Sequence, residues 1–413
     1  MWHGAPYRIW AEPLILKVQK ENYTFTLEIN SDGEPEFTIM NGEKVIKSVP
    51  AAYKKDEDVV GLRNKGTELK KQVSRIRKSL EEAMIRQDAF TMEEVVGLSR
   101  HPILSAFFRK LVLTGNNVTG LPGIDGKSLT GPDGERHEVS DSASLRIAHS
   151  YDLMISGKWD VWQKYFFSNH IKQPFRQVFR ELYVLTEAEK QTNGSSPRYS
   201  GHNIRSQQTV AMLGKRGWVI HPEEGLRKNL HRENITVYLN FSNYYYFYSG
   251  ENEIWSIDTI DFTERGKWKS VPWDKITPIT FSEVMRDVDL VVSVAHSENY
   301  NPEATMSTVE MRLALVRETC SMLCLTNVEV TDSRVLVYGE LGEYSIHPGS
   351  AAVHKMPGGH ICIIPVESQK MDRVFLPFAD NDPKTAELIS KVLLLAEDKK
   401  IKSPHILQQI TRS

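Results

Sequence analysis

Cysteine is scarce in this sequence, and long apolar runs are absent from it. Cys320, Cys324 and Cys362 are too few to form a framework of disulfides. The spacing of the first two is also unusual for a structural zinc site. No stretch approaches the ~20 consecutive apolar residues that a membrane helix needs. Residues 1–6 lack the basic and apolar regions of a secretion signal. We therefore expect a protein of the reducing cytoplasm that does not contact a membrane.

An excess of charge of one sign is also lacking. The 51 lysines and arginines nearly balance the 53 aspartates and glutamates, so the net charge of −2 provides no general attraction to nucleic acid or to a membrane. The motifs of familiar enzymes are missing too: the GxSxG elbow, HExxH, the kinase signature set and GxGxxG after a strand. These absences favour a non-enzyme without excluding an enzyme.

The residues that are present have the composition of a globular protein. Hydrophobic residues make up 40% and charged residues 25% of a chain long enough for two cores. Alternating apolar and polar residues before residue 50 predict a small antiparallel β meander. Helical spacing of apolar residues then predicts one helix through about residue 87, a second after Thr91 and a third over 104–113. A loop is expected over 114–141, which is rich in Gly, Asp, Pro and Ser.

The second part of the chain mixes strands and helices. Strands are predicted over 235–239 and 254–262, and the run Asp289–Ala295 has the continuous apolar character of a buried strand. Asn301, followed by proline, is typical of a helix start, and a final amphipathic helix begins at Asp382. Further short strands are predicted over 328–330, 335–339, 361–366 and 374–376.

These elements predict an α+β protein with a mainly helical first half, followed by a mixed α/β C-terminal part with an antiparallel-rich sheet. No internal repeat is visible. The regions expected from composition are a small β meander over 1–50, a mainly helical region over 51–233 with a basic segment at 158–232, a β-rich connector over 234–278, and an α+β C-terminal domain over 279–413.

The basic segment is the clearest charged feature. Residues 158–232 contain thirteen lysines or arginines and six acids, a balance of 13 − 6 = +7. In the helix predicted around them, Arg176 and Arg180 lie one turn apart, and two guanidinium groups at this spacing suit a phosphate or carboxylate. The favoured alternative is that they pair with acidic residues of the C-terminal part, such as Glu310 or Glu318.

A histidine, a glycine and a serine follow a predicted strand at His347, Gly349 and Ser350. Backbone N–H groups and a hydroxyl in such a position can bind an anion, and the histidine can supply a proton. A simple β-turn explains the same residues without a ligand and is favoured, because Pro348 and Gly349 suit its two central positions.

Two other patterns are assigned to turns. Residues 126–128, Gly-Lys-Ser, resemble the end of a phosphate-binding loop, but Leu121 stands where that loop needs a glycine. The histidines and cysteine between 347 and 362 could ligate a metal only if no turn over 356–359 separated them. We therefore predict no metal and no cofactor.

Several motifs together resemble one known family. They are Arg146–Met154, Ile171–Tyr183, Arg198–His202 and Lys215–Trp218, with further similarity at Val288–His296, Ser307–Arg312, Arg317–Thr319, Ile346–Ser350 and Leu376–Asp380. Over about residues 55–400 the chain is similar to the MolR-like family, the bacterial domain of unknown function of the 4132 type, often found in WGR-containing proteins. The resemblance implies no reaction. It implies the C-terminal module of a larger protein, from a fragment or a short gene, because a WGR domain and the long N-terminal part of larger relatives are not visible.

Two hypotheses follow from these observations. The first is a non-catalytic regulatory or interaction module whose basic face contacts a protein partner or the remainder of a larger chain. The second is an enzyme or sensor that binds a phosphorylated or nucleotide-like ligand between the basic helix and the C-terminal sheet. The residues expected to hold such an anion are Arg176, Arg180, His202 and Arg216, with His347, Gly349 and Ser350 opposite. Nucleic acid is disfavoured as a partner, because neither a basic domain nor a recognisable nucleic-acid fold is evident.

Overall fold

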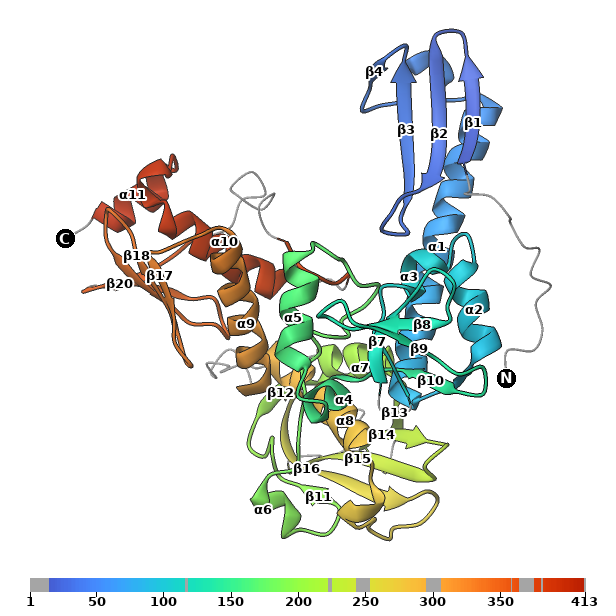
Figure 1. Ribbon diagram of the computed structural model, residues 1–413. Coiled ribbons are helices and arrows are strands. Elements are labelled where there is room, and N and C mark those ends of the chain that lie inside the picture. The colour runs from blue at the N-terminus through green and yellow to red at the C-terminus, as the bar shows by residue number, and fades with distance from the viewer. Residues whose placement is uncertain are drawn as a thin grey trace. The chain divides into compact units, whose positions relative to one another are not determined.

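The computed structural model describes residues 15–115, 118–221, 225–242, 253–294, 306–357, 359–363, 375–379 and 382–411 (Figure 1). Over these residues the protein is α+β with several antiparallel sheets, which confirms the predicted fold class. The chain divides into two compact units, Met1–Phe179 with Pro377–Asp380, and Arg180–Leu376 with Asn381–Ser413. These units do not follow the four regions expected from composition, and each is described by itself.

The first unit begins with a four-stranded antiparallel sheet in sequence order: β1 (Ile15–Lys20), β2 (Tyr23–Ile29), β3 (Pro35–Asn41) and β4 (Lys44–Val45). Phe25, Leu27 and Ile39 of this sheet are buried against Val59 and Leu62, at the start of a long helix. Figure 1 shows the sheet in blue along the N-terminal half of that helix, α1. The alternating pattern of the strands supplies the apolar face that this helix covers.

Helix α1 (Glu57–Arg86) is the helix predicted from apolar spacing, and it is confirmed. The Asp56 side chain accepts hydrogen bonds from the backbone N–H groups of Asp58 and Val59, which caps its N-terminus. The helix ends at Gln87, whose φ of 55° is left-handed. Its C-terminal half buries Val73, Leu80 and Met84 in a second core of the same unit.

A six-stranded antiparallel sheet frames this second core. Its order is β5 (Phe90–Thr91), β10 (Ser144–Ile147), β6 (Leu113–Gly115), β7 (Val118–Pro122), β8 (Ser128–Thr130) and β9 (Arg136–Glu138). The loop predicted over 114–141 is therefore wrong. Its strands are only three to five residues long, too short to show alternation between their Gly- and Asp-rich turns.

Besides α1, the α-helices described in the first unit are α2 (Met92–Arg100), α3 (Ser105–Phe108), α4 (Ser150–Ile155) and α5 (Trp159–Ser168). Helix α2 begins with the predicted capping signal at Thr91, which forms a reciprocal capping box with Glu94. The helix predicted over 104–113 is wrong beyond α3, since Leu113 begins a strand.

The helical conformation predicted around Arg176 and Arg180 is also wrong. No helix is assigned to residues 169–186, although 173–183 are almost entirely buried. Gln177 explains this: its side-chain amide bonds to the backbone N–H and C=O of Val112 and to the C=O of Ala148. Tertiary hydrogen bonds thus replace the local ladder of a helix in this buried segment.

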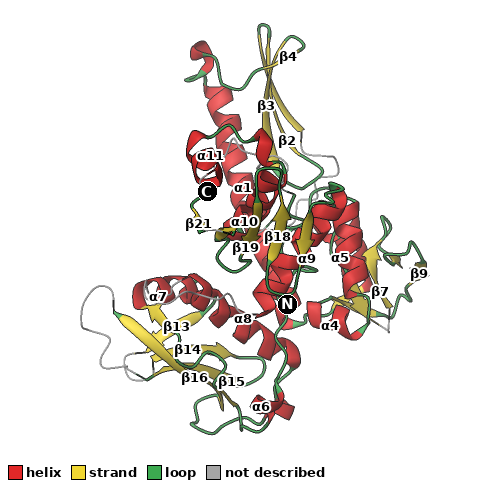
Figure 2. Ribbon diagram, turned by 90° about the vertical axis from the view of Figure 1, so that its left-hand side faces the viewer, coloured by secondary structure: helices red, strands yellow, loops and turns green. Residues whose placement is uncertain are grey.

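The second unit contains α6 (Glu187–Lys190), α7 (Ser206–Gly214) and a sheet ordered β11 (Ser195–Ser196), β16 (Ile254–Glu264), β15 (Ile235–Phe241), β14 (Gly225–Leu230) and β13 (Trp218–His221), with β12 (Asn203–Arg205) also paired to β16. The two strands predicted over 235–239 and 254–262 are confirmed. Helices α7 and α8 (Pro278–Val294) lie against this sheet (Figure 2).

The buried strand predicted at Asp289–Ala295 is wrong, because its described residues belong to α8. Phe281, Met285 and Val288 of α8 share one core with the sheet residues Val237 and Phe262. A helix buried on most sides shows the same continuous apolar run as a buried strand, so periodicity alone cannot separate the two.

The remaining elements are α9 (Met306–Met322), an antiparallel sheet of β17 (Val328–Val330), β18 (Val335–Tyr338), β19 (Glu343–Ile346), β20 (Val353–Met356) and β21 (His360–Ile361), then α10 (Pro383–Ala396) and α11 (Pro404–Thr411). Helix α10 starts at the predicted cap, Asp382. The cap predicted at Asn301 lies outside the described residues, as do residues 364–366 and 374 of the strands predicted over 361–366 and 374–376. Among the other residues of these two predicted strands only Ile361 belongs to a strand, so the prediction is wrong at 362–363 and 375–376. Among the helices that the structure describes, none is both long and apolar enough to span a bilayer.

Candidate functional site

Helix α8 carries the most concentrated group of buried charges in the second unit. Glu283, Asp287 and Asp289 are all less than 6% exposed, although the same helix supplies apolar residues to the core. Glu283 and Asp287 are four residues apart and lie on one face. Buried carboxylates are costly unless each is paired and hydrogen-bonded, so the partners of these three residues define the site.

Arg180 is the partner of Glu283. Its Nε and Nη2 atoms donate to Oε1 and Oε2 of Glu283, each at 2.6 Å, and the two side chains are 1% and 6% exposed. This bidentate geometry is the strongest that an arginine and a carboxylate can form. The next residue, Glu181, accepts from Nε of Arg286 at 2.8 Å. Segment 180–181 is thus joined to α8 by two ion pairs. It supplies the cation of the first pair and the anion of the second.

Asp287 has three partners from other elements. Trp218 Nε1 and Lys228 Nζ donate to its Oδ2 at 2.9 and 2.7 Å. Arg216 Nε lies 3.4 Å from its Oδ1. The first two residues pair across β13 and β14, so the edge of the sheet and the end of α7 meet at one carboxylate.

Asp289 is the centre of a buried cluster of hydroxyl groups. Tyr183 Oη and Thr308 Oγ1 both donate to its Oδ2 at 2.5 Å. Tyr199 donates to the backbone oxygen of Met285 at 3.1 Å, one turn earlier on α8. Burial, with the nearby charge of Asp289, raises the pKa of both tyrosines well above the usual value. Both phenols therefore stay protonated at neutral pH and act as hydrogen-bond donors.

His202 lies at the edge of this cluster. It is half-buried, and its ring centroid is 6.3 Å from that of Tyr199. Burial lowers the pKa of His202, and the negative charge of Asp289 opposes that shift. A neutral histidine near a buried carboxylate could accept a proton, which makes this the most reactive arrangement of the site.

Helix α9 connects the cluster to the turn at 347–350. Thr308, which bonds to Asp289, is followed four residues later by Arg312. Arg312 Nη1 donates to the backbone oxygens of Pro348 and Gly349 at 3.2 and 2.7 Å. Residues four apart on a helix share a face and rise about 6 Å along the axis. One face of α9 thus contacts both the Asp289 cluster and the turn.

The turn itself is closed by its own residues. Nδ1 of His347 accepts from the Ser350 N–H at 3.3 Å and lies 3.2 Å from Oγ of Ser350. The backbone oxygen of Ala351 accepts from the buried Lys391 at 2.8 Å. The serine N–H therefore donates to a side chain within the turn, and the backbone N–H of Ala351 closes the turn by donating to the His347 oxygen at 2.8 Å.

The residues predicted to hold an anion fall in different places. Arg180, His202 and Arg216 come together around α8, while His347, Gly349 and Ser350 form the turn held by Arg312. Arg176 belongs to the first unit, where its guanidinium stacks on Phe378 at 4.4 Å.

The acidic half of the site was not predicted from the sequence. Arg180 and Arg216 are bound by Glu283 and Asp287, whereas the acids expected to pair, Glu310 and Glu318, are exposed and half-buried. The signal in the sequence was the spacing of the acids within an apolar run. Their spacing places them on the face of a helix, but only if the run is interpreted as a helix and not as a strand.

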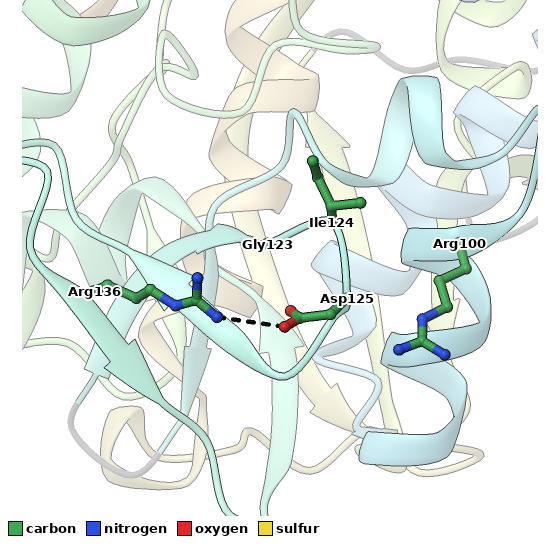
Figure 3. Close-up of a pocket in the computed structure, with 5 residues that line it drawn as sticks. All are labelled: Arg100, Gly123, Ile124, Asp125 and Arg136. Carbon is green, nitrogen blue, oxygen red and sulfur yellow. Dashed lines mark hydrogen bonds and ion pairs between the residues drawn. The ribbon is translucent and has the colours of Figure 1, made fainter.

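The first unit contains a separate cavity of about 360 Å³ at the turn between β7 and β8. Figure 3 shows the carboxylate of Asp125 between the side chains of Arg100 and Arg136, 3.3 Å from Nη2 of Arg136. The pKa of Asp125 is lowered, chiefly by the hydrogen bond that its carboxylate accepts from the backbone N–H of Lys127. The Gly-Lys-Ser sequence here forms a hairpin turn, with Gly126 at φ +72°, so the predicted turn is present.

The described ranges contain no cluster of three or more histidine, cysteine or acidic residues that could hold a metal.

Two family models match the chain. Residues 44–218 match the Domain of unknown function (DUF4132), and residues 309–410 match the Domain of unknown function (DUF7737). No curated protein and no solved structure matches. The first match includes the four motifs between 146 and 218, but the C-terminal position expected for this domain is wrong. The chain thus carries a DUF4132-type domain in its first half, and its C-terminal residues match a second domain of unknown function.

Proposed function

We propose that this protein is a non-catalytic regulatory or interaction module in which much of the basic segment serves internal pairing. The observation that carries this proposal is the buried, bidentate ion pair between Arg180 and Glu283. Asp287 also pairs with Lys228 at 2.7 Å and with the partly exposed Arg216 at 3.4 Å. These charges hold segments of the second unit against α8.

Energetics support an internal role for Arg180. Breaking a buried ion pair by removing one partner costs roughly 3–5 kcal/mol, because the other charge stays buried without compensation. A ligand that withdrew Arg180 from Glu283 would have to offset that cost before gaining affinity. Recognition by this module is therefore expected at surfaces outside the α8 site.

A thermal-shift screen tests the proposal. The purified chain would be heated with nucleotides, ADP-ribose, phosphosugars and oxyanions including molybdate. A ligand at one hundred times its dissociation constant stabilises the folded state by about 2.7 kcal/mol, which is easily detected. We expect a cooperative melt without a hit. A hit that disappears in Arg216→Ala or His347→Ala, and persists in the exposed control Lys215→Ala, would overturn the proposal.

The second candidate is an enzyme or sensor for a phosphorylated or nucleotide-like ligand. The specific observation in its favour is that Thr308 and Arg312 link the Asp289 cluster to the turn of His347 through one face of α9. Such a ligand would contact His202, whose half-buried ring is the accessible edge of the cluster. A ligand that stabilises the wild type in the thermal-shift screen, but not His202→Gln, would support this candidate.

The finer assignments belong to the same proposal. The DUF4132 match supports a DUF4132-type domain. A relation to the bacterial MolR-like family, with its association with WGR proteins and a regulatory role, is proposed from the similarity of the motifs alone. The low cysteine content supports a cytoplasmic location. A partner protein, or the remainder of a larger chain, would bind this module. Co-purification of the tagged, natively expressed protein tests whether a partner binds. Recovery of the free monomer alone would count against this proposal.

A further inference from the structure

A basic and aromatic hairpin follows β16 in the second unit. Thr263 and Ser270 pair as an antiparallel bridge, and the backbone N–H of Glu264 donates to Lys269 O at 2.8 Å. The tip has the sequence Arg-Gly-Lys-Trp-Lys over residues 265–269. Its glycine, Gly266, has a φ of +73°, which few other residues adopt at low cost.

Trp268 at this tip is 72% exposed, a large apolar surface to leave in water. Its indole stacks on the ring of Tyr238, with centroids 4.9 Å apart and planes inclined by 22°. Tyr238 is itself buried. The two rings therefore form a flat platform that is supported from below and mostly exposed above.

The platform lies on the face of the sheet opposite α8. Val237 and Leu239 point into the core that α8 completes, so Tyr238 between them points the other way. Arg227 pairs with Tyr238 in the neighbouring strand β14, and Asp261 pairs with it in β16. Asp261 accepts hydrogen bonds from two other side chains, at 2.5 and 2.7 Å.

Three cations lie within three residues of Trp268 in the sequence. Arg265, Lys267 and Lys269 oppose a single acid at the tip, Glu264, which gives a local balance of 3 − 1 = +2. The lysine side chains are 68% and 73% exposed and lie 2.9 and 3.0 Å from Glu264. Exposed pairs of this kind contribute little, so both lysines can exchange Glu264 for another anion.

We propose that this hairpin binds single-stranded nucleic acid. A base stacks on Trp268, and the phosphates beside it contact Arg265, Lys267 and Lys269. The inference rests on the proposed function as an interaction module and names the partner of one of its surfaces. An anionic membrane would attract the same charges, but an indole lying flat on Tyr238 is placed for stacking and not for insertion into a bilayer.

Fluorescence anisotropy of labelled oligo-dT and oligo-U of about twelve nucleotides, with the full chain, tests this proposal. We expect binding at low salt, with an affinity that falls as about the second power of salt concentration, since each phosphate contributes a slope of about −0.7. A duplex competitor should compete poorly. Trp268→Leu, which keeps an apolar cover on Tyr238, should weaken binding about tenfold.

The charge is tested by Lys267→Ala with Lys269→Ala, and the matched control is Lys70→Ala with Lys71→Ala, two exposed lysines of α1. Only the hairpin pair should lower both affinity and salt slope. An absence of binding at low salt, or equal affinity in the two double variants, would overturn the proposal. So would binding only to phosphatidylserine vesicles. A small-molecule hit in the thermal-shift screen would instead overturn the module and leave this assay unaffected.

Discussion

Arg180 has almost no exposed surface, and its position shows why a basic segment in a sequence need not be a basic face. Its guanidinium is held by both oxygens of Glu283. An arginine can leave water only when its charge and its donors are satisfied together, which a carboxylate achieves with a single side chain. Whether this arginine is available to a ligand or paired within the protein depends on a carboxylate 103 positions away in the sequence.

We therefore predict that Arg180→Met destabilises the protein by about 3–5 kcal/mol, because Glu283 is left buried without its counter-charge. Urea denaturation measures the change. Adding Glu283→Leu should recover much of the loss. The matched control is Arg317→Ala, which removes an exposed arginine 3.8 Å from Asp332 and should change stability by less than about 0.5 kcal/mol. Equal effects of the two arginine substitutions would contradict the prediction.

His202 gives a prediction on pH. Burial lowers its pKa in the folded state, so the unfolded chain binds more protons below the ordinary histidine value. Stability contributed by the neutral ring is complete above about pH 6.5 and decreases as the pH falls below it. The loss between pH 7.5 and 5.5 should be smaller in His202→Gln than in the wild type. Urea midpoints at the two pH values measure it, and an identical loss would refute the role of this ring.

At the scale of single elements, local signals succeeded where a helix or strand is long or has its own cap. Helix α1 follows its apolar spacing, and α2 begins at its capping box. Local signals failed where tertiary contacts decide the secondary structure. Gln177 bonds to the backbone of Val112 and Ala148, which adjoin β6 and β10, and keeps its segment out of a helix. Helix α8 shows an apolar run typical of a strand.

The capping box of α2 supports a prediction at this scale. Thr91→Ala removes the hydroxyl that accepts from the N–H of Glu94, and should cost about 1 kcal/mol. Thr67→Ala, in the exposed interior of α1, is the control and should be neutral or slightly stabilising, because alanine is the better helix former. Thermal melts of both variants measure the difference. Similar shifts would show that the box is not stabilising.

At the scale of the molecule, each unit is completed by chain segments that are distant in sequence. Residues 377–379 return to the first unit, where Gln173 donates its N–H to Pro377 and accepts from Ala379. Phe378 is 2% exposed between Arg176 and Phe179. The first unit therefore requires a segment that follows most of the second unit in the sequence.

Phe378→Ala should accordingly destabilise the first unit by about 3–5 kcal/mol. Hydrogen–deuterium exchange should show faster exchange in β6 and β10, which belong to that unit. The matched variant Phe281→Ala, in the core of the second unit, should act instead on β15 and β16. Faster exchange in the same strands for both variants would contradict the division into two units.

The sequence by itself determined the α+β class, the capped helices, the strands at 235–239 and 254–262, and the turn at His347, because each depends on residues close together along the chain. The tertiary structure alone decided the rest. Whether a buried apolar run becomes a helix or a strand depends on what covers it, as in α8. Which acid neutralises Arg180 depends on which carboxylate is buried beside it. Both outcomes are set by desolvation and pairing between segments that are distant in the sequence, 103 positions apart for Arg180 and Glu283, and local patterns do not record such contacts.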